Sequence, residues 1–245
     1  MIDTRKQAEL DHGRFLVGRA ARVWGQAGRA GQERVRRRSR LLLEAAGARP
    51  EMRILELGCG TGEYTARLCG RAAGEAELVA LDLSHDLLRL ASARPLPAPV
   101  RFVRGDAERL PFPTGSFDAV VGNAVLHHLR VGAALAEVRR VLRPEGRCAF
   151  SEPNMLNPQV VVQKNVPPIK RWLGDTPHET AFLAPQVRQA LLAAGLTVER
   201  VEPFDFLHPA IPAWAVAPAQ RLEAWLERLP LVSGMAGSLL IVARR

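Results

Sequence analysis

The sequence is poor in cysteine. Its 245 residues include three, Cys59, Cys69 and Cys148, an odd number that lacks the paired spacing of zinc ligands. A disulfide framework and a metal site are therefore both disfavoured. We expect reduced, buried thiols and no bound metal.

Long apolar runs are also missing. No uninterrupted stretch approaches the ~18 residues of a membrane-spanning helix. The start, MIDTRKQAELDHGRF, has charged residues where a signal peptide would have an apolar core. We therefore expect a soluble, cytoplasmic protein, and its length fits one large domain or a domain with a cap.

Lysine is scarce, so arginine supplies most of the formal net charge of +9. Such a charge would suit an anionic partner, either nucleic acid or a phospholipid surface. A coding bias toward arginine and alanine would give the same composition. A solvated basic face is therefore the simpler interpretation, and nucleic acid is disfavoured as a partner.

Apolar runs and helical patterns alternate from residue 50 to residue 152. This alternation is typical of an α/β fold, a doubly wound, Rossmann-like parallel sheet with helices on both faces. A helical segment, residues 1–49, precedes it. We expect strands over 53–58, 77–82, 100–105, 117–123 and 146–152, and helices over 61–72, 84–93 and 124–142.

The alternation stops after Glu152. Residues 153–184 are rich in Pro and Asn and are long for a connection, so we expect an inserted lid there. Residues 185–245 complete the core. They are expected to hold a helix over 185–194, a strand over 197–204, a second insertion at 207–236 with a helix over 221–229, and a last strand over 238–245.

The stretch ILELGCGTGEY, residues 54–64, carries the most specific signal. An apolar strand leads into Gly58, Gly60 and Gly62, and a helix follows. The glycines thus form a turn at the carboxyl edge of the sheet, where backbone amides can approach a ligand. A dinucleotide site would favour G-x-G-x-x-G, whereas here the acidic Glu63 follows the third glycine and would repel a pyrophosphate.

This pattern resembles the class I S-adenosylmethionine-dependent methyltransferases, in particular the methyltransferase type 11 or ubiquinone-menaquinone biosynthesis group. Their first motif is E-x-G-x-G-x-G, here Glu56 to Gly62. The resemblance covers residues 50–152 densely and the terminal strands more loosely. It implies a seven-stranded, mostly parallel sheet with an antiparallel last strand. It also implies S-adenosylmethionine as cofactor and S-adenosylhomocysteine as product.

The resemblance also implies which residues hold the cofactor. Asp82 ends the second strand, where a carboxylate can accept both ribose hydroxyls; capping the next helix is the alternative, although Ser84 is available for that. Glu56 either orients the glycine turn or meets the methionine ammonium group. The expected set is Glu56, Gly58, Cys59, Gly60, Gly62, Tyr64, Asp82 and Leu83, with Asp106 and Ala107 at the adenine and Asn123 at the end of the fourth strand.

Methyl transfer to oxygen would be helped by a base, and histidine suits because its ordinary pKa is close to neutrality. His127 and His128 follow the fourth strand. Adjacent helical residues diverge by about 100°, so at most one of them faces the cavity. We choose His127, with Glu152 as the second candidate. Capping or packing of the helix is the alternative for the pair, and His178, Asp205 and His208 in the inserted regions are further candidates.

The acceptor is inferred from the inserted regions. Their apolar side chains favour an apolar acceptor pocket, unless they pack only on each other. We expect a small, partly apolar, even lipid-like acceptor that is methylated at oxygen rather than nitrogen or carbon. Peripheral membrane contact through basic residues and tryptophans also fits the composition. These side chains are Met155, Trp172, Phe182, Phe204, Phe206 and Trp214.

Other functions stay open. An RNA methyltransferase fits the charge and would bind RNA with a steep salt dependence. An NAD-dependent oxidoreductase is disfavoured by the glycine spacing and by Asp106 and Ala107. A DNA amino-methyltransferase is disfavoured because NAVL stands where Asn or Asp, two prolines and an aromatic residue would be required. A cofactor-binding protein without catalysis would bind the cofactor but not turn it over.

Overall fold

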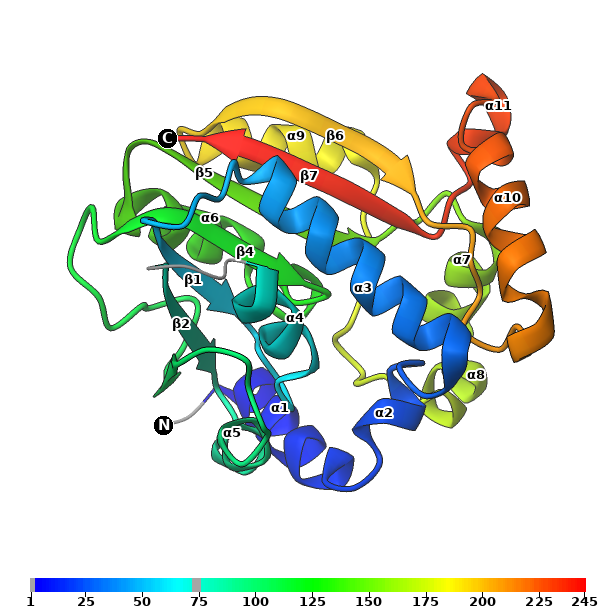
Figure 1. Cartoon of the computed structure of the whole chain (residues 1–245), viewed down its shortest axis with the longest axis horizontal. Coiled ribbons are helices and arrows are strands. Elements are labelled where there is room, and N and C mark those ends of the chain that lie inside the picture. The colour runs from blue at the N-terminus through cyan, green and yellow to red at the C-terminus, as the bar shows by residue number, and fades with distance from the viewer. Residues whose placement is uncertain (1–2, 72–75) are drawn as a thin grey trace.

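The computed structural model describes residues 3–71 and 76–245, which contain a seven-stranded sheet (Figure 1). The strand order is β3-β2-β1-β4-β5-β7-β6. Strands β1 to β5 pair in parallel, and β7 runs antiparallel to both of its neighbours, β5 and β6. This confirms the predicted fold class. The strands are β1 (Arg53–Leu57), β2 (Glu77–Asp82), β3 (Val100–Arg104), β4 (Phe117–Asn123), β5 (Leu142–Pro153), β6 (Thr197–Phe204) and β7 (Ser238–Arg244).

Helices cover both faces of the sheet (Figure 1). Among the described residues, no helix combines the length and the apolar character needed to cross a bilayer. The helices are α1 (Thr4–Leu16), α2 (Ala20–Val23), α3 (Gly28–Ala45), α4 (Glu63–Arg71), α5 (His85–Ser92), α6 (Val131–Val141), α7 (Pro158–Asn165), α8 (Pro167–Trp172), α9 (Ala184–Ala193), α10 (Val216–Leu226) and α11 (Pro230–Ser233), with the 3-10 helices η1 (Leu126–His128) and η2 (Ala213–Ala215).

The core forms two layers because side chains alternate along each strand. Ile54 of β1 packs with α3 and α4 on one face, whereas Leu55 packs with α6 and α9 on the other. Ala149 and Phe150 of β5 divide in the same way. Both faces of the central strands are therefore apolar, which explains why their sequences are continuous apolar runs.

Two predicted helices differ in the structure. The helix expected over 124–142 is interrupted: Ala124 has a φ of 51°, η1 follows, and α6 begins only at Val131. The helical segment 1–49 is divided into three helices at Gly18 and Gly25, whose φ angles are 74° and 61°. The end predicted at Ala72 for the helix of residues 61–72 lies outside the described residues. The domain boundaries drawn from the sequence remain a prediction.

The order of the strands fixes where a ligand can bind. The chain leaves β1 toward β2 on one side of the sheet, while β4 continues the sheet on the other side of β1. The helices on either side therefore diverge at the carboxyl ends of β1 and β4 and open a crevice there, as is general in sheets of this kind. The glycine turn and the histidine pair follow these two strands.

We predict that Leu135→Ala lowers the free energy of unfolding by about 2 to 5 kcal/mol, because it removes a buried side chain from the core under α6. Leu192→Ala in α9 is the matched control, since Leu192 is 63% exposed and its loss should cost less than about 0.5 kcal/mol. Urea unfolding of both variants checks this. Equal effects of the two substitutions would contradict the assigned layering.

Candidate active site

A cavity of about 580 Å³ opens at the carboxyl edge of the sheet, within the range usual for ligand sites. The glycine turn, the ends of β2, β3 and β4, and η1 form its floor. Helices α1, α2 and α3 and the lid helix α7 form its walls. Of the expected cofactor-binding residues, those that line it are Gly58, Cys59, Gly60, Tyr64, Asp82, Leu83, Asp106, Ala107 and Asn123.

The glycine turn requires glycine for two reasons. Gly58, Gly60 and Gly62 have φ angles of 68°, 54° and 77°, which other residues rarely adopt. A Cβ at Gly58 would also lie 2.6 Å from a methyl carbon of Val125, and one at Gly60 would lie 2.8 Å from the ring of Trp24. The turn is therefore held tightly between its neighbours.

Asp82 connects the turn to the end of β2. Its Oδ2 accepts a hydrogen bond from the Gly60 amide at 2.7 Å, and its Oδ1 accepts one from the Ser84 amide at 2.8 Å. Burial raises the pKa of Asp82, while these two amides oppose the rise. Each carboxylate oxygen has a second lone pair, so both can still accept a hydroxyl from a ligand in the cavity.

Glu56 lies behind the turn and does not line the cavity. It is 3% exposed, and the hydroxyl of Thr65 in α4 donates to its Oε2 at 2.6 Å. Burial raises its pKa from 4.5 to about 8. Of the two roles considered for Glu56, this placement favours orienting the turn. Gly62 also lies outside the cavity, against Ala91 of α5.

His127 and Glu152 form a buried pair next to the turn. Glu152, 1% exposed at the end of β5, accepts the amides of Val125 and Leu126 through Oε1, at 2.9 and 2.8 Å. Its Oε2 lies 2.7 Å from Nδ1 of His127. His127 lines the cavity, whereas Glu152 stands behind it. Burial lowers the pKa of His127, as does the charge of His128, against the raising effect of Glu152.

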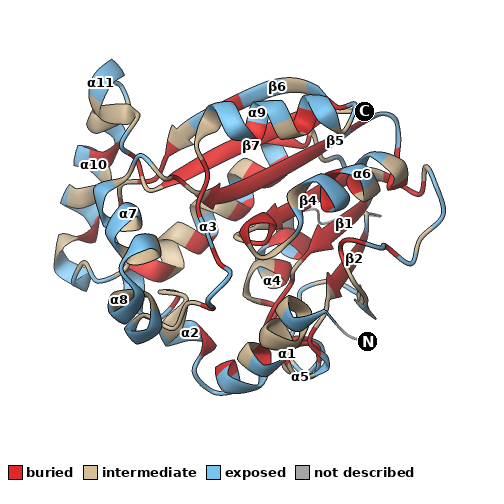
Figure 2. Cartoon of the chain, turned by 180° about the vertical axis from the view of Figure 1, so that it is seen from behind, coloured by how far each residue is buried: buried red, intermediate tan, exposed pale blue. Residues whose placement is uncertain are grey.

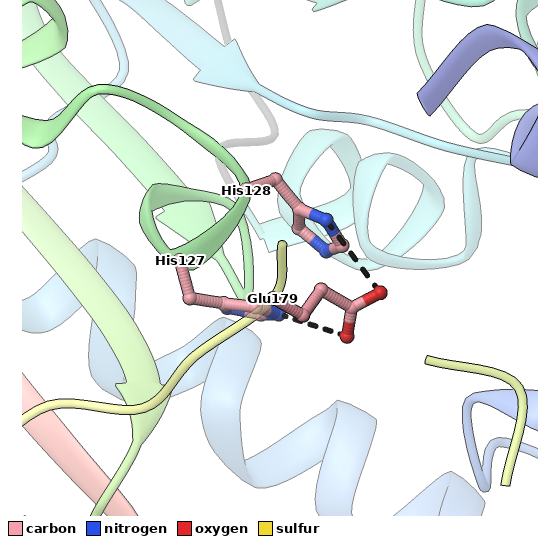
Figure 3. Close-up of side chains that lie close together, drawn as sticks. All are labelled: His127, His128 and Glu179. Carbon is pink, nitrogen blue, oxygen red and sulfur yellow. Dashed lines mark ion pairs between the residues drawn. The ribbon is translucent and has the colours of Figure 1, made fainter. Parts of the chain in front are cut away.

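Figure 3 shows that His127, His128 and Glu179 point toward one another, Glu179 coming from the lid. Their possible ligand atoms lie within 4.8 Å of one another, so the three side chains could hold a metal ion. The sequence predicts no metal site. The ammonium of Lys164 lies 2.9 Å from Oε2 of Glu179. That carboxylate therefore already has a cation partner, and a divalent ion would have to displace it.

His128 is held differently from His127. Its Nδ1 lies 3.0 Å from the Glu9 carboxylate of α1. Burial lowers the pKa of His128, but Glu9 and Glu179 outweigh it, so the net shift is upward. The two adjacent histidines are thus shifted in opposite directions, and His127 is the one that favours the neutral form.

The N-terminal helices contribute cavity residues that we had not predicted. Lys6 of α1 binds Asp106, and Trp24 packs over Gly60. Arg34 and Arg38 of α3 both bind Asp205, and Arg38 also donates to Oδ1 of Asn123 at 3.3 Å. The spacing of four between the two arginines places them on one face of a helix and was the available signal.

The other candidate residues of the inserted regions lie partly in the cavity and partly outside it. His208 lines the cavity, Asp205 does so while bound to the arginines, and His178 is exposed. Of the six side chains expected to form an apolar pocket, Phe206 lines the cavity. Trp172 and Trp214 are each 83% exposed, Phe182 and Phe204 are buried in the two core layers, and the sulfur of Met155 lies 3.7 Å from Asn165 in the lid.

Known proteins resemble this chain. The family model described as a methyltransferase domain matches residues 55–150. A demethylmenaquinone methyltransferase of Mycolicibacterium vanbaalenii is 37% identical over 180 residues, which cover 67% of this chain and 73% of that protein. One of Beutenbergia cavernae is 40% identical over 123 residues, covering 50% and 48%. The chain thus spans about half the length of some curated relatives.

Solved structures share the fold. An S-adenosylmethionine-dependent methyltransferase from Mesorhizobium loti matches with a TM-score of 0.60 and 23% identity. The match covers 89% of this chain and 99% of that one. At this level of identity the likeness shows the architecture alone, whereas the sequence relatives above carry the family assignment.

We predict that Glu56 makes stability depend on pH. The unfolded chain loses this proton near pH 4.5 and the folded chain near pH 8. The stabilisation is therefore complete below the first value and is lost as pH rises to the second, by roughly 5 kcal/mol. Glu56→Gln should keep the bond from Thr65 and flatten the loss of unfolding free energy between about pH 5 and pH 8.

Urea unfolding at several pH values checks this prediction, with Glu51→Gln as control because Glu51 is exposed just before β1. The control should follow the wild-type pH dependence. If Glu56→Gln and wild type lose stability in parallel as pH rises, the buried carboxyl does not hold its proton.

Proposed function

The chain belongs to the class I S-adenosylmethionine-dependent methyltransferases, and we propose that it methylates an oxygen of a small, partly apolar acceptor. The cofactor of this family is S-adenosylmethionine. The observation that carries the proposal is the His127 and Glu152 pair beside the glycine turn. It is the arrangement expected of a base that removes a proton from a hydroxyl.

The cavity residues fit this cofactor. Asp82 has a free lone pair on each oxygen for the two ribose hydroxyls, and the turn residues 58–61 line the cavity. Ala107 lines the same cavity without a bulky side chain, which leaves room for a purine beside it. When bound, S-adenosylmethionine supplies an electrophilic methyl group on its sulfonium.

The pair defines the proton's path. Burial favours neutral His127. Because the Glu152 carboxylate beside Nδ1 accepts rather than donates, Nδ1 would carry the hydrogen and Nε2 would keep a free lone pair. Nε2 lies 3.8 Å from Oε2 of Glu179, and both residues line the cavity. It would accept the proton of the acceptor hydroxyl as the oxygen to methyl bond forms. The Glu152 carboxylate stabilises the imidazolium that results.

Side chains of the lid and of residues 206–207 indicate what kind of acceptor fits the cavity. The lid presents the polar Gln163 and Asn157 and the apolar Val160 to the cavity. Phe206, just before the second insertion, and Leu207, its first residue, also line the cavity and are apolar. This mixture suits a molecule with one or two hydroxyl groups on an apolar body, since few polar contacts suffice to orient it.

A ring carbon beside the hydroxyl is a second candidate for the methylated atom. It is favoured by the relatives named demethylmenaquinone methyltransferase and by others named C-methyltransferase. The same base would serve, because removal of the hydroxyl proton increases electron density at the neighbouring carbon. Mass and nuclear magnetic resonance analysis of the product distinguishes the two atoms.

We predict that Asp82→Ala weakens binding of S-adenosylmethionine and S-adenosylhomocysteine by about tenfold to a hundredfold, since hydrogen bonds to a charged group are lost. Isothermal titration calorimetry measures both dissociation constants. Asp86→Ala, which changes a half-buried aspartate of α5 that does not line the cavity, is the matched control and should bind as wild type does. An unchanged affinity in Asp82→Ala would remove Asp82 from the cofactor site, and NADH should not bind either protein.

We predict that His127→Ala lowers kcat by about 10² to 10⁴ while cofactor affinity stays unchanged. Naphthohydroquinone and catechol serve as trial acceptors, and release of S-adenosylhomocysteine is measured. In wild type, kcat should fall as pH drops through the lowered pKa of His127, which lies below 6.5, and the variant should lack this fall.

His178→Ala is the control for that experiment, because His178 is an exposed histidine of the lid. It should turn over as wild type does. Undiminished turnover in His127→Ala, with the same pH profile, would assign the proton transfer to another group.

A further inference from the structure

Exposed apolar side chains concentrate on the two insertions. Among the residues that the structure describes, thirteen large apolar side chains are exposed, and ten of them lie in the segments 156–172 and 214–235. Leu231 is 92% exposed, and Trp172 and Trp214 are each 83% exposed. The ten are Leu156, Val161, Val162, Val166, Trp172, Trp214, Leu222, Trp225, Leu231 and Met235, here called the lid surface.

The two insertions form one continuous end of the molecule. Helices α7, α8, α10 and α11 gather at the same end in both views (Figures 1 and 2). The amide of Asn154 donates to the carbonyl oxygens of Gly234 and Ala236, at 2.9 and 2.8 Å. Asn157 donates to that of Met235 at 2.8 Å. The apolar side chains are therefore carried by segments fixed to one another.

The charges around the lid surface have one sign. Residues 153–174 contain no aspartate or glutamate. Residues 206–235 contain Glu223 and Glu227, and Arg37 binds both, at 2.5 and 2.6 Å. In contrast, Arg171, Arg221 and Arg228 are exposed. An apolar surface edged by unbalanced positive charge is complementary to an anionic interface with an apolar interior.

We propose that the lid surface docks on an anionic phospholipid bilayer. Tryptophan prefers the boundary between lipid head groups and hydrocarbon, because its ring is apolar and its N–H is polar. Three of the four tryptophans of the chain, Trp172, Trp214 and Trp225, belong to this surface. Exposed apolar side chains in such number are otherwise unfavourable in water.

Docking would place the cavity directly behind the bilayer contact. Helix α7 separates the cavity from the exposed surface. Its residues Val160, Gln163 and Lys164 line the cavity, while Val161 and Val162 are exposed. A lipid-like acceptor would then reach His127 from the membrane side. This direction of access rests on the function proposed above, whereas docking itself does not require it.

Flotation of the full chain with vesicles tests the proposal. Vesicles of phosphatidylcholine alone are compared with vesicles of phosphatidylcholine and phosphatidylglycerol in equal parts, without acceptor or cofactor. We expect binding to the anionic vesicles. Trp172→Ser with Trp214→Ser should weaken it by at least about tenfold, and Arg171→Glu by about fivefold or more.

Matched controls lie elsewhere on the surface. Leu192→Ser removes an exposed leucine from α9, and Arg101→Glu reverses an exposed arginine on β3. Both should bind vesicles within about twofold of wild type. Titration with S-adenosylmethionine, which should be normal in every variant, shows that folding and the proposed function are intact independently of docking.

Three outcomes would overturn the proposal. The first is no binding to either vesicle, and the second is binding that the tryptophan substitutions leave unchanged. The third is a stable dimer in sedimentation velocity that the same substitutions dissociate, because a second copy would then cover the lid surface.

Discussion

The buried carboxylate of Glu152 makes three contacts that set the geometry of the site. Its oxygens hold the amides of Val125 and Leu126 and the Nδ1 of His127. A buried carboxylate is costly unless donors surround it, and these three donors all come from the turn after β4. The same contacts explain why the helix predicted from Ala124 is interrupted at η1 and why His127 rather than His128 is anchored to the sheet. They also leave Nε2 of His127 free of Glu152, which any role as a base requires.

Much of the positive charge of the chain is used inside the protein. Arg34 and Arg38 bind Asp205, and Arg37 binds Glu223 and Glu227, so helix α3 is tied to the C-terminal segments through buried ion pairs. Lys164 binds Glu179 of the lid. Removing one partner of such a pair leaves a largely buried charge uncompensated, which destabilises the folded state. Such pairs leave the net charge of +9 unchanged, so the excess is carried by basic side chains outside them. Exposed arginines near the lid remain available to bind an anionic partner.

The sequence was most informative where structure depends on local pattern. The strands follow from continuous apolar runs, and the glycine turn follows from three glycines that each adopt a positive φ. The family resemblance supplied the antiparallel direction of the last strand. Contacts between distant segments were not foreseen: Lys6 reaches Asp106, and Trp24 packs over Gly60. The expectation that Trp172 and Trp214 form an acceptor pocket met the same difficulty, since an apolar side chain in an insertion can face a cavity, a core or the solvent with no change in its spacing.

The proposed base requires that Glu152 holds neutral His127 with its hydrogen on Nδ1 and a free lone pair on Nε2. The nitrogen chemical shifts and long-range proton couplings of the histidine rings, measured by nuclear magnetic resonance at neutral pH, report this directly, with His127→Ala to assign the ring and Glu152→Gln to perturb it. We predict that His127 shows a protonated, hydrogen-bonded Nδ1 and an unprotonated Nε2, and that Glu152→Gln changes the distribution. A hydrogen on Nε2 alone, or an imidazolium at neutral pH, would contradict this account of the site.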